Sequence, residues 1–133
     1  MAPILFVDDD DALLRAYRRM YAGRFEVYTA RSGADAIATL GAHEAWGAVI
    51  SDLCMRDGDG ASLLTWVRRN LPVLAERMLF VTGAECPAEL AEFAGAHRDR
   101  ILIKPFTPLE LQEKLEQVLG TPVTASGSLT LRG

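Results

Sequence analysis

The sequence predicts an α/β fold in which helices cover both faces of a five-stranded parallel sheet. Three observations support this. Five short apolar runs alternate with amphipathic segments along the 133 residues. Most of these runs are nearly continuous in apolar residues, which is typical of parallel strands buried on both faces. Half of the residues are hydrophobic, and a chain of this length is large enough for one domain with a substantial core.

The first strand is predicted over Ile4–Val7, and a helix follows it. An aspartate, Asp10 or Asp11, begins that helix, since its side chain can accept hydrogen bonds from the free N–H groups of the first turn. Gly23 is expected to end it. Apolar side chains recur on one face of this helix at Leu14, Tyr17 and Tyr21. The second strand is predicted over Phe25–Ala30. Ser32 begins the second helix, whose apolar positions are Ala34, Ile37, Ala38 and Leu40.

The third strand is predicted over Ala48–Ser51 and leads directly into Asp52. The loop Met55–Gly60 connects it to a helix whose apolar positions are Leu63, Leu64, Val67 and Leu71. The fourth strand covers Met78–Val81 and ends at Thr82-Gly83. Pro87 suits the first turn of the next helix, whose apolar positions are Leu90, Ala91, Phe93 and Ala94.

The fifth strand is predicted over Ile101–Ile103, and the last helix has the clearest end signals in the chain. Thr107 and Glu110 form a capping box with Pro108 at the first helical position. The helix should run to Leu119, with Gly120 as its terminator. The domain is therefore predicted to cover residues 1–120. Residues 121–133, rich in Thr, Ser and Gly, are expected to form a flexible tail or the start of a linker.

Four of the five predicted strands lead into a polar or charged residue. Asp8 and Asp9 follow the first strand, Asp52 the third, Thr82 the fourth and Lys104 the fifth. The carboxyl ends of parallel strands lie at one edge of the sheet, where ligands bind in open α/β folds. The sequence therefore predicts a site at this edge.

The run Asp8–Asp11 is the most informative feature of that edge. Helix capping explains Asp10 or Asp11, but it does not explain two carboxylates directly on the strand end. Like charges this close cost stability unless a partner offsets them, and Mg²⁺, or Mn²⁺ in its place, prefers such oxygen ligands. A cation, a lysine and a hydroxyl together suit a phosphoryl group. Asp52 is the best candidate for a covalent acceptor, because it stands alone after its strand.

Composition excludes several classes of function. The formal net charge of −4 argues against broad binding of nucleic acid or anionic membranes. No apolar stretch has the length of a membrane span, and Met1-Ala2-Pro3 does not begin a signal peptide. Two cysteines do not make a disulfide framework, so a cytoplasmic location is expected.

A few residues match no chemical motif. His43 and His97 are expected at the surface, and Trp46 and Trp66 are expected to pack in the core. Cysteines Cys54 and Cys86 fall on loops at the predicted active edge, where a redox link is an alternative to two inert thiols.

The chain resembles the receiver domains of two-component response regulators from roughly Pro3 to Leu119. The resemblance rests on five motifs in order: Ile4–Asp10, Val49–Met55, Asp59-Gly60, Val81–Gly83 and Lys104–Phe106. It implies a flavodoxin-like (βα)5 receiver fold. It also implies that a histidine kinase or a histidine phosphotransfer protein phosphorylates Asp52.

The same resemblance implies a role for each residue of the predicted site. Lys104 would pair with the phosphate, Thr82 would donate a hydrogen bond to it, and the Lys104–Pro105 peptide bond would be cis. The implied Mg²⁺ ligands are Asp8 (through water), Asp9, Asp52 and the backbone carbonyl of Cys54.

The resemblance further implies a switch rather than an enzyme, with no chemistry beyond its own phosphoryl transfer and autodephosphorylation. Phosphorylation would alter the surface of the fourth helix, fifth strand and fifth helix, which would control an unknown output partner or a homodimer. Four positions depart from the family pattern. Arg56 replaces a common proline, and Ile101 replaces the usual aromatic residue. Cys54 and Ala84 lack the acid or amide that commonly tunes hydrolysis, which suggests slow hydrolysis.

Two alternatives belong to other classes. One is a phosphorylation-independent pseudo-receiver that acts only by binding. The other is a haloacid-dehalogenase-like phosphatase, in which Asp8 would be the nucleophile and Asp10 the general acid. The phosphatase would leave Asp52 without a role. It would also need a late acidic pair, whereas the acidic residues after Lys104 lie on a helix: Glu110, Glu113 and Glu116.

Overall fold

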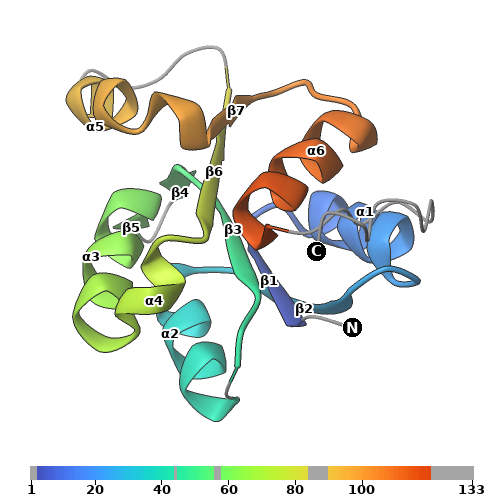
Figure 1. The fold of residues 1–133 in the computed structure, drawn as a ribbon, viewed down its shortest axis with the longest axis horizontal. Helices are drawn as coiled ribbons and strands as arrows, with labels where there is room; N and C mark the ends of the chain where they lie inside the picture. Colours follow the sequence, from blue (N-terminus) through green and yellow to red (C-terminus); the bar gives the residue numbers. More distant parts are fainter. Residues whose placement is uncertain (1–2, 44, 56–57, 84–89, 121–133) are drawn as a thin grey trace.

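The computed structural model describes residues 3–43, 45–55, 58–83 and 90–120, with the backbone alone at 58–59. Its main sheet has five parallel strands in the order β2-β1-β3-β6-β7 (Figure 1). These strands are β1 (Pro3–Val7), β2 (Glu26–Ala30), β3 (Ala48–Asp52), β6 (Met78–Thr82) and β7 (Ile101–Ile103). A short antiparallel pair, β4 (Cys54–Met55) and β5 (Gly58–Asp59), follows β3. The predicted five-stranded parallel sheet is confirmed.

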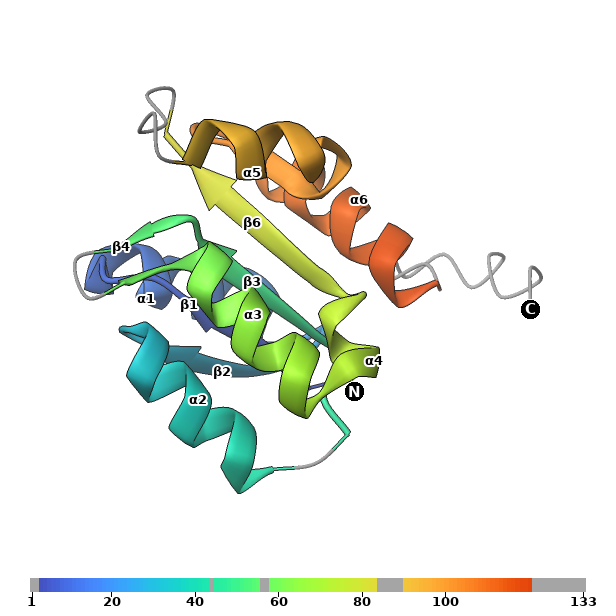
Figure 2. The same ribbon diagram turned by 90° about the vertical axis from the view of Figure 1, so that its left-hand side faces the viewer.

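Helices cover both faces of this sheet (Figures 1 and 2). The helices on one face are α1 (Asp11–Tyr21) and α6 (Pro108–Leu119). Those on the other face are α2 (Gly33–Ala42), α3 (Gly60–Asn70), α4 (Pro72–Ala75) and α5 (Ala91–Ala96). The one-turn helix α4 was not expected from the sequence. Two hydrophobic clusters result, one on each side of the sheet, because every residue of β3 and β6 is buried.

The helix ends follow the predicted caps closely. Asp10 caps α1 by accepting from the N–H groups of Ala12 and Leu13. Thr107 and Glu110 form the predicted capping box of α6. Gly120 ends that helix with φ of 76°, a left-handed conformation that glycine adopts without steric cost.

Some local predictions were wrong. In α2, Ala36 and Leu40 are buried, whereas Ala34 and Ala38 are exposed, so the buried face differs from the predicted one. Helix α1 ends at Tyr21, two residues before Gly23. The predicted cap Pro87 lies outside the described residues.

Other elements differ in extent. Strand β3 reaches Asp52 and β6 reaches Thr82, one residue further than predicted in each case. Leu71 lies beyond the end of α3, because Pro72 begins α4 directly after it.

Gly60, the first residue of α3, packs against the end of β3. A Cβ atom at this position would lie 3.0 Å from the Asp52 carbonyl oxygen and 3.0 Å from the Phe80 ring. Neither neighbour moves freely, since one is backbone and the other is a buried ring. The absence of a side chain therefore lets α3 start directly beside Asp52.

We predict that Gly60→Ala lowers the free energy of unfolding by about 1–3 kcal/mol through this overpacking. Gly41→Ala is the matched control, because a Cβ atom there meets nothing within 4 Å and lies on an exposed part of α2. It should raise stability by up to about 1 kcal/mol through helix propensity. Urea unfolding of both variants measures the difference, and equal effects would contradict this account of Gly60.

Candidate functional site

Three carboxylates meet where the sheet order reverses. The chain leaves β1 toward β2 on one side and reaches β3 on the other, so the ends of β1 and β3 lie side by side. Asp8 and Asp9 follow β1, and Asp52 ends β3. One ligand atom from each of the three lies within 4.8 Å of the others. The structure thus brings together the three acidic side chains that the sequence assigned to one site.

Lys104 supplies positive charge to this acidic cluster. Its Nζ lies 3.4 Å from Asp8 Oδ2 and 3.7 Å from Asp52 Oδ2. The backbone N–H of Lys104 donates to the Thr82 carbonyl at 2.7 Å, which fixes the lysine next to the end of β6. The Lys104–Pro105 peptide bond is cis, as the resemblance implied. Thr82 itself is buried at the carboxyl end of β6.

Burial raises the pKa values of two of these acids. The pKa of Asp52 rises to about 6, first because of burial and then because of the nearby Asp8 carboxylate, while Lys104 opposes the rise. Burial also raises the pKa of Asp8, although the Asp10 N–H and Lys104 oppose it. One lysine therefore does not compensate for the negative charge at this edge.

Local hydrogen bonds hold the carboxylates in place. Asp8 Oδ1 accepts from the Asp10 N–H at 2.9 Å, and Asp52 Oδ1 accepts from the Cys54 N–H at 3.3 Å. Asp11 forms an exposed ion pair with Arg31. The four consecutive aspartates therefore have separate tasks, since the first two form the site and the last two stabilise the start of α1.

The donor set fits a hard divalent cation. Carboxylate oxygens are the ligands that Mg²⁺ and Mn²⁺ prefer, and three of them converge here with a surplus of negative charge. Cys54 pairs with Asp59 in the short β4–β5 ladder, and the part of its carbonyl in the ligand set stays a prediction. The chemistry of the cluster suits a cation that also neutralises a phosphoryl group.

The sequence reasoning assigned Tyr17 to the core and missed its hydroxyl group. Tyr17 is 1% exposed and stacks on Phe6 with ring centroids 4.5 Å apart. Within the described part of the chain, its Oη is buried without a hydrogen-bond partner. Burial, and then the Asp8 carboxylate, raise the pKa of this phenol. The sequence did offer a signal for this buried hydroxyl, since a tyrosine stands at a helix position that otherwise suits a simple apolar residue.

A cluster of three aromatic side chains packs between β6 and α5. The Phe80 ring lies edge-on to Phe93 at 5.2 Å, and Phe93 stacks on His97 at 4.2 Å. His97 is half-buried, in contrast to the surface position expected for it. Ile101, where the family pattern has an aromatic residue, is half-buried against the same core.

Comparison with known proteins bears directly on this site. The family model described as "Response regulator receiver domain" matches residues 4–116, which is most of the chain. The chain belongs to this family of two-component signalling domains. The match confirms the predicted resemblance.

Named relatives agree with this assignment. A chemotaxis protein CheY homolog of Campylobacter jejuni is 32% identical over 120 residues, covering 89% of this chain and 92% of the relative. Chemotaxis protein CheY1 of Helicobacter pylori is 31% identical and covers 89% of this chain and 97% of the relative. A CheY-like receiver domain protein from Methanospirillum hungatei has a similar structure, with a TM-score of 0.77, 25% identity and coverage of 100% and 99%.

The phosphatase alternative is not supported. The family match is to a receiver, a class of signalling domain rather than enzyme, and the Asp10 side chain caps α1 instead of facing the cluster as a general acid would.

Across the described ranges of the chain, no helix is both long and apolar enough to cross a membrane.

The raised pKa of Asp52 predicts how stability depends on pH without metal. A carboxyl group with a higher pKa in the folded state takes up protons on folding between its ordinary value and about 6. Its contribution to stability is therefore present at low pH and is lost as the pH rises through this window. Asp52→Asn should remove this loss and make the metal-free protein about 1–2 kcal/mol more stable at pH 7.

Urea unfolding of both proteins in a chelator, at pH 4.5 and pH 7.5, measures this effect. The advantage of Asp52→Asn should be clear at the higher pH and shrink at the lower one. An advantage that is equal at both values, or a less stable variant at pH 7.5, would contradict the charge account.

Proposed function

We propose that this chain is a phosphorylatable receiver in which Asp52 accepts a phosphoryl group from a phosphohistidine of a histidine kinase or a histidine phosphotransfer protein. The observation that carries the proposal is the position of Asp52, whose carboxylate lies beside that of Asp8 and 3.7 Å from the Lys104 ammonium at one edge of the sheet. In the transfer, an Asp52 oxygen forms a bond to phosphorus as the bond from phosphorus to the histidine nitrogen breaks.

The residues around Asp52 would stabilise the phosphoryl group. Lys104 is close enough to both carboxylates to turn toward a new phosphoryl charge. Thr82 is adjacent to Lys104 through the backbone contact of their strands, and its hydroxyl would donate a hydrogen bond. Thr82 ends β6 and Lys104 directly follows β7, so movement of both residues would displace the elements next to these two strand ends.

Asp8, Asp9, Asp52 and the Cys54 carbonyl are the residues that would hold Mg²⁺, or Mn²⁺ in its place. When bound, the cation would supply charge neutralisation for the incoming phosphoryl oxygens. Asp8 would act through water, since its Oδ1 already accepts from the Asp10 N–H and its Oδ2 faces Lys104.

The output would pass through α5, β7 and α6, the elements that follow Thr82 and Lys104. Two large apolar side chains are exposed there, Ile103 at 58% and Leu109 at 57%. Such a surface suits an output partner or a homodimer whose affinity changes with phosphorylation. The partner itself is not identified by these residues, and neither nucleic acid nor membrane is proposed.

The remaining assignments complete the proposal. The receiver domain would cover residues 1–120, with 121–133 as a flexible tail or the start of a linker. The chain would act in the cytoplasm and catalyse only its own phosphoryl transfer and autodephosphorylation.

A pseudo-receiver is the second candidate, and the departure at Ile101 is the observation that favours it.

Incubation with Mg²⁺ and acetyl phosphate tests the acceptor. We expect a phosphoryl adduct by intact mass on the wild type, because the small donor needs only the site itself. The adduct should be labile to base and should not form when the incubation contains a chelator. Asp52→Asn should carry none. An adduct that persists in Asp52→Asn would overturn the assignment, and its absence from wild type with every donor, kinase included, would favour the pseudo-receiver.

Lys104→Ala tests the switch separately from the acceptor. The variant should still gain the adduct, within about tenfold of the wild-type rate, because the carboxylates remain. Its backbone amide spectrum should no longer change at α5 and β7 on phosphorylation. Lys114→Ala is the matched control, since Lys114 donates to the Asp99 carbonyl away from the cluster. A normal spectral response in Lys104→Ala would contradict the role given to Lys104.

A further inference from the structure

A pocket lies at the edge of the sheet opposite the carboxylates. Its volume is about 600 Å³, which falls within the range of small-molecule sites. Trp46 lies just before β3 and Arg77 just before β6, so the pocket is at the starts of the two strands whose ends carry Asp52 and Thr82. It is therefore separate from the site described above.

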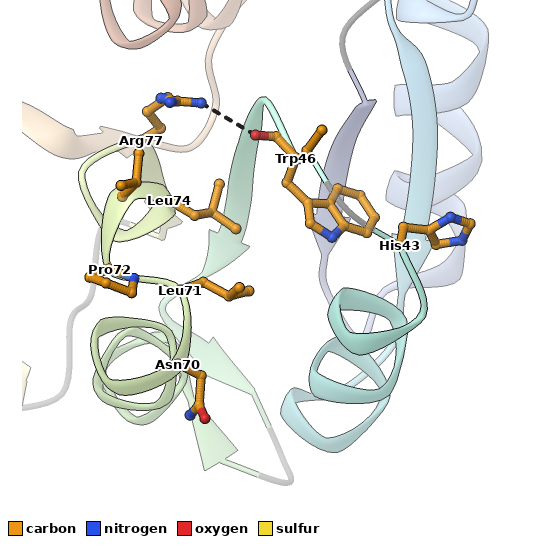
Figure 3. A pocket seen from close by; sticks show the side chains of 9 residues that line it. His43, Trp46, Asn70, Leu71, Pro72, Leu74 and Arg77 are labelled. Carbon is orange, nitrogen blue, oxygen red and sulfur yellow. Dashed lines mark hydrogen bonds between the residues drawn. The ribbon is translucent and has the colours of Figure 1, made fainter.

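Aromatic and aliphatic side chains form the walls of this pocket (Figure 3). Trp46 is held by a hydrogen bond from its indole N–H to the Leu40 carbonyl at 3.2 Å. His43 stands edge-on to Trp46, with centroids 5.7 Å apart. Leu71 and Leu74 lie opposite Trp46 in Figure 3. Trp46 and Leu74 form the buried floor of the pocket, at 6% and 5% exposed, so a flat apolar body would rest at its mouth against His43, Leu71 and Val73.

Arg77 gives the pocket a positive charge. Its Nη1 donates to the carbonyl oxygens of Trp46 and Gly47 at the long distances of 3.3 and 3.4 Å. Among the described residues, no carboxylate forms an ion pair with it. Since a guanidinium has five N–H donors in a planar fork, Arg77 keeps donors for a carboxylate. Glu76 faces a neighbouring hollow that Arg77 also borders.

From this charge and these walls, we propose that the pocket between α2 and α4 binds a small aromatic carboxylate. The ring system rests over Trp46 at the mouth formed by His43, Leu71 and Val73, and the carboxylate pairs with Arg77. This site is independent of phosphorylation, because none of its residues belongs to the acidic cluster. The proposal does not depend on the function proposed above.

Naphthalene-2-carboxylate is a suitable probe, with naphthalene-2-carboxamide as its neutral counterpart. Backbone and indole N–H signals in two-dimensional NMR report binding, since Trp46 lines the pocket and Trp66 does not. We expect saturable shifts at Trp46, Leu71 and Leu74, with a dissociation constant on the order of 1 mM or below. The carboxamide should bind about threefold to tenfold more weakly, because it lacks the charge.

Three variants separate the contributions. Arg77→Gln should reduce carboxylate affinity to that of the carboxamide and leave carboxamide binding unchanged, while Arg77→Lys should keep part of the preference. Arg69→Gln is the matched control, since this exposed arginine near the end of α3 does not line the pocket. Asp52→Asn should bind like the wild type, which separates this test from the proposed phosphorylation.

Several outcomes would overturn the proposal. The first is equal affinity for the two probes, and the second is an equal loss of carboxylate affinity in Arg77→Gln and Arg69→Gln. The third is the absence of a saturable shift at Trp46 up to the solubility limit of the carboxylate. Binding that strengthens severalfold when residues 121–133 are removed would identify the tail as the occupant. Shifts at Trp46 that depend on protein concentration alone would identify a second copy of the chain. If Arg77→Gln fails to fold, Arg77→Lys and the two probes still decide the result.

Discussion

The surplus of negative charge at the reversal point of the sheet is the constraint around which the site is arranged. β1 and β3 are neighbours, so their terminal aspartates must lie close together, and burial keeps water from screening them. Lys104, brought in by β7, relieves part of this repulsion. The site is therefore held in a state that additional positive charge would stabilise, which is the physical reason that we propose a cation and a phosphoryl group as its ligands.

The scaffold can tolerate this charge because the strands behind it are apolar and well packed. Each residue of β3 and β6 is buried, and the two helical layers cover both faces. Gly60 allows α3 to begin against Asp52, and Asp10 secures the start of α1. Strands packed on both faces therefore hold the polar side chains at their ends in defined positions.

The two ends of β3 and β6 differ sharply in chemistry. Their carboxyl ends carry the buried polar residues Asp52 and Thr82, whereas their amino ends follow Trp46 and Arg77, beside an apolar pocket. The hydrogen bond from the Val49 N–H to the Arg77 carbonyl, at 3.2 Å, joins the two strands at that amino end. A ligand there would therefore contact the residues that lead into the two strands whose other ends carry Asp52 and Thr82.

The sequence alone determined the parallel sheet, the caps of α1 and α6, and the residues of the acidic cluster, because apolar runs, Asp and Thr caps and strand-end charges are local signals. Only the tertiary structure decided other features. The buried face of α2 depends on which side meets the sheet, and the one-turn helix α4 depends on Leu74 and Ala75 packing into the core, since Pro72 itself is exposed. The elevated pKa of Asp52, the unpartnered Tyr17 hydroxyl and the Trp46–Arg77 pocket all arise from burial between segments distant in the chain, which no local pattern records.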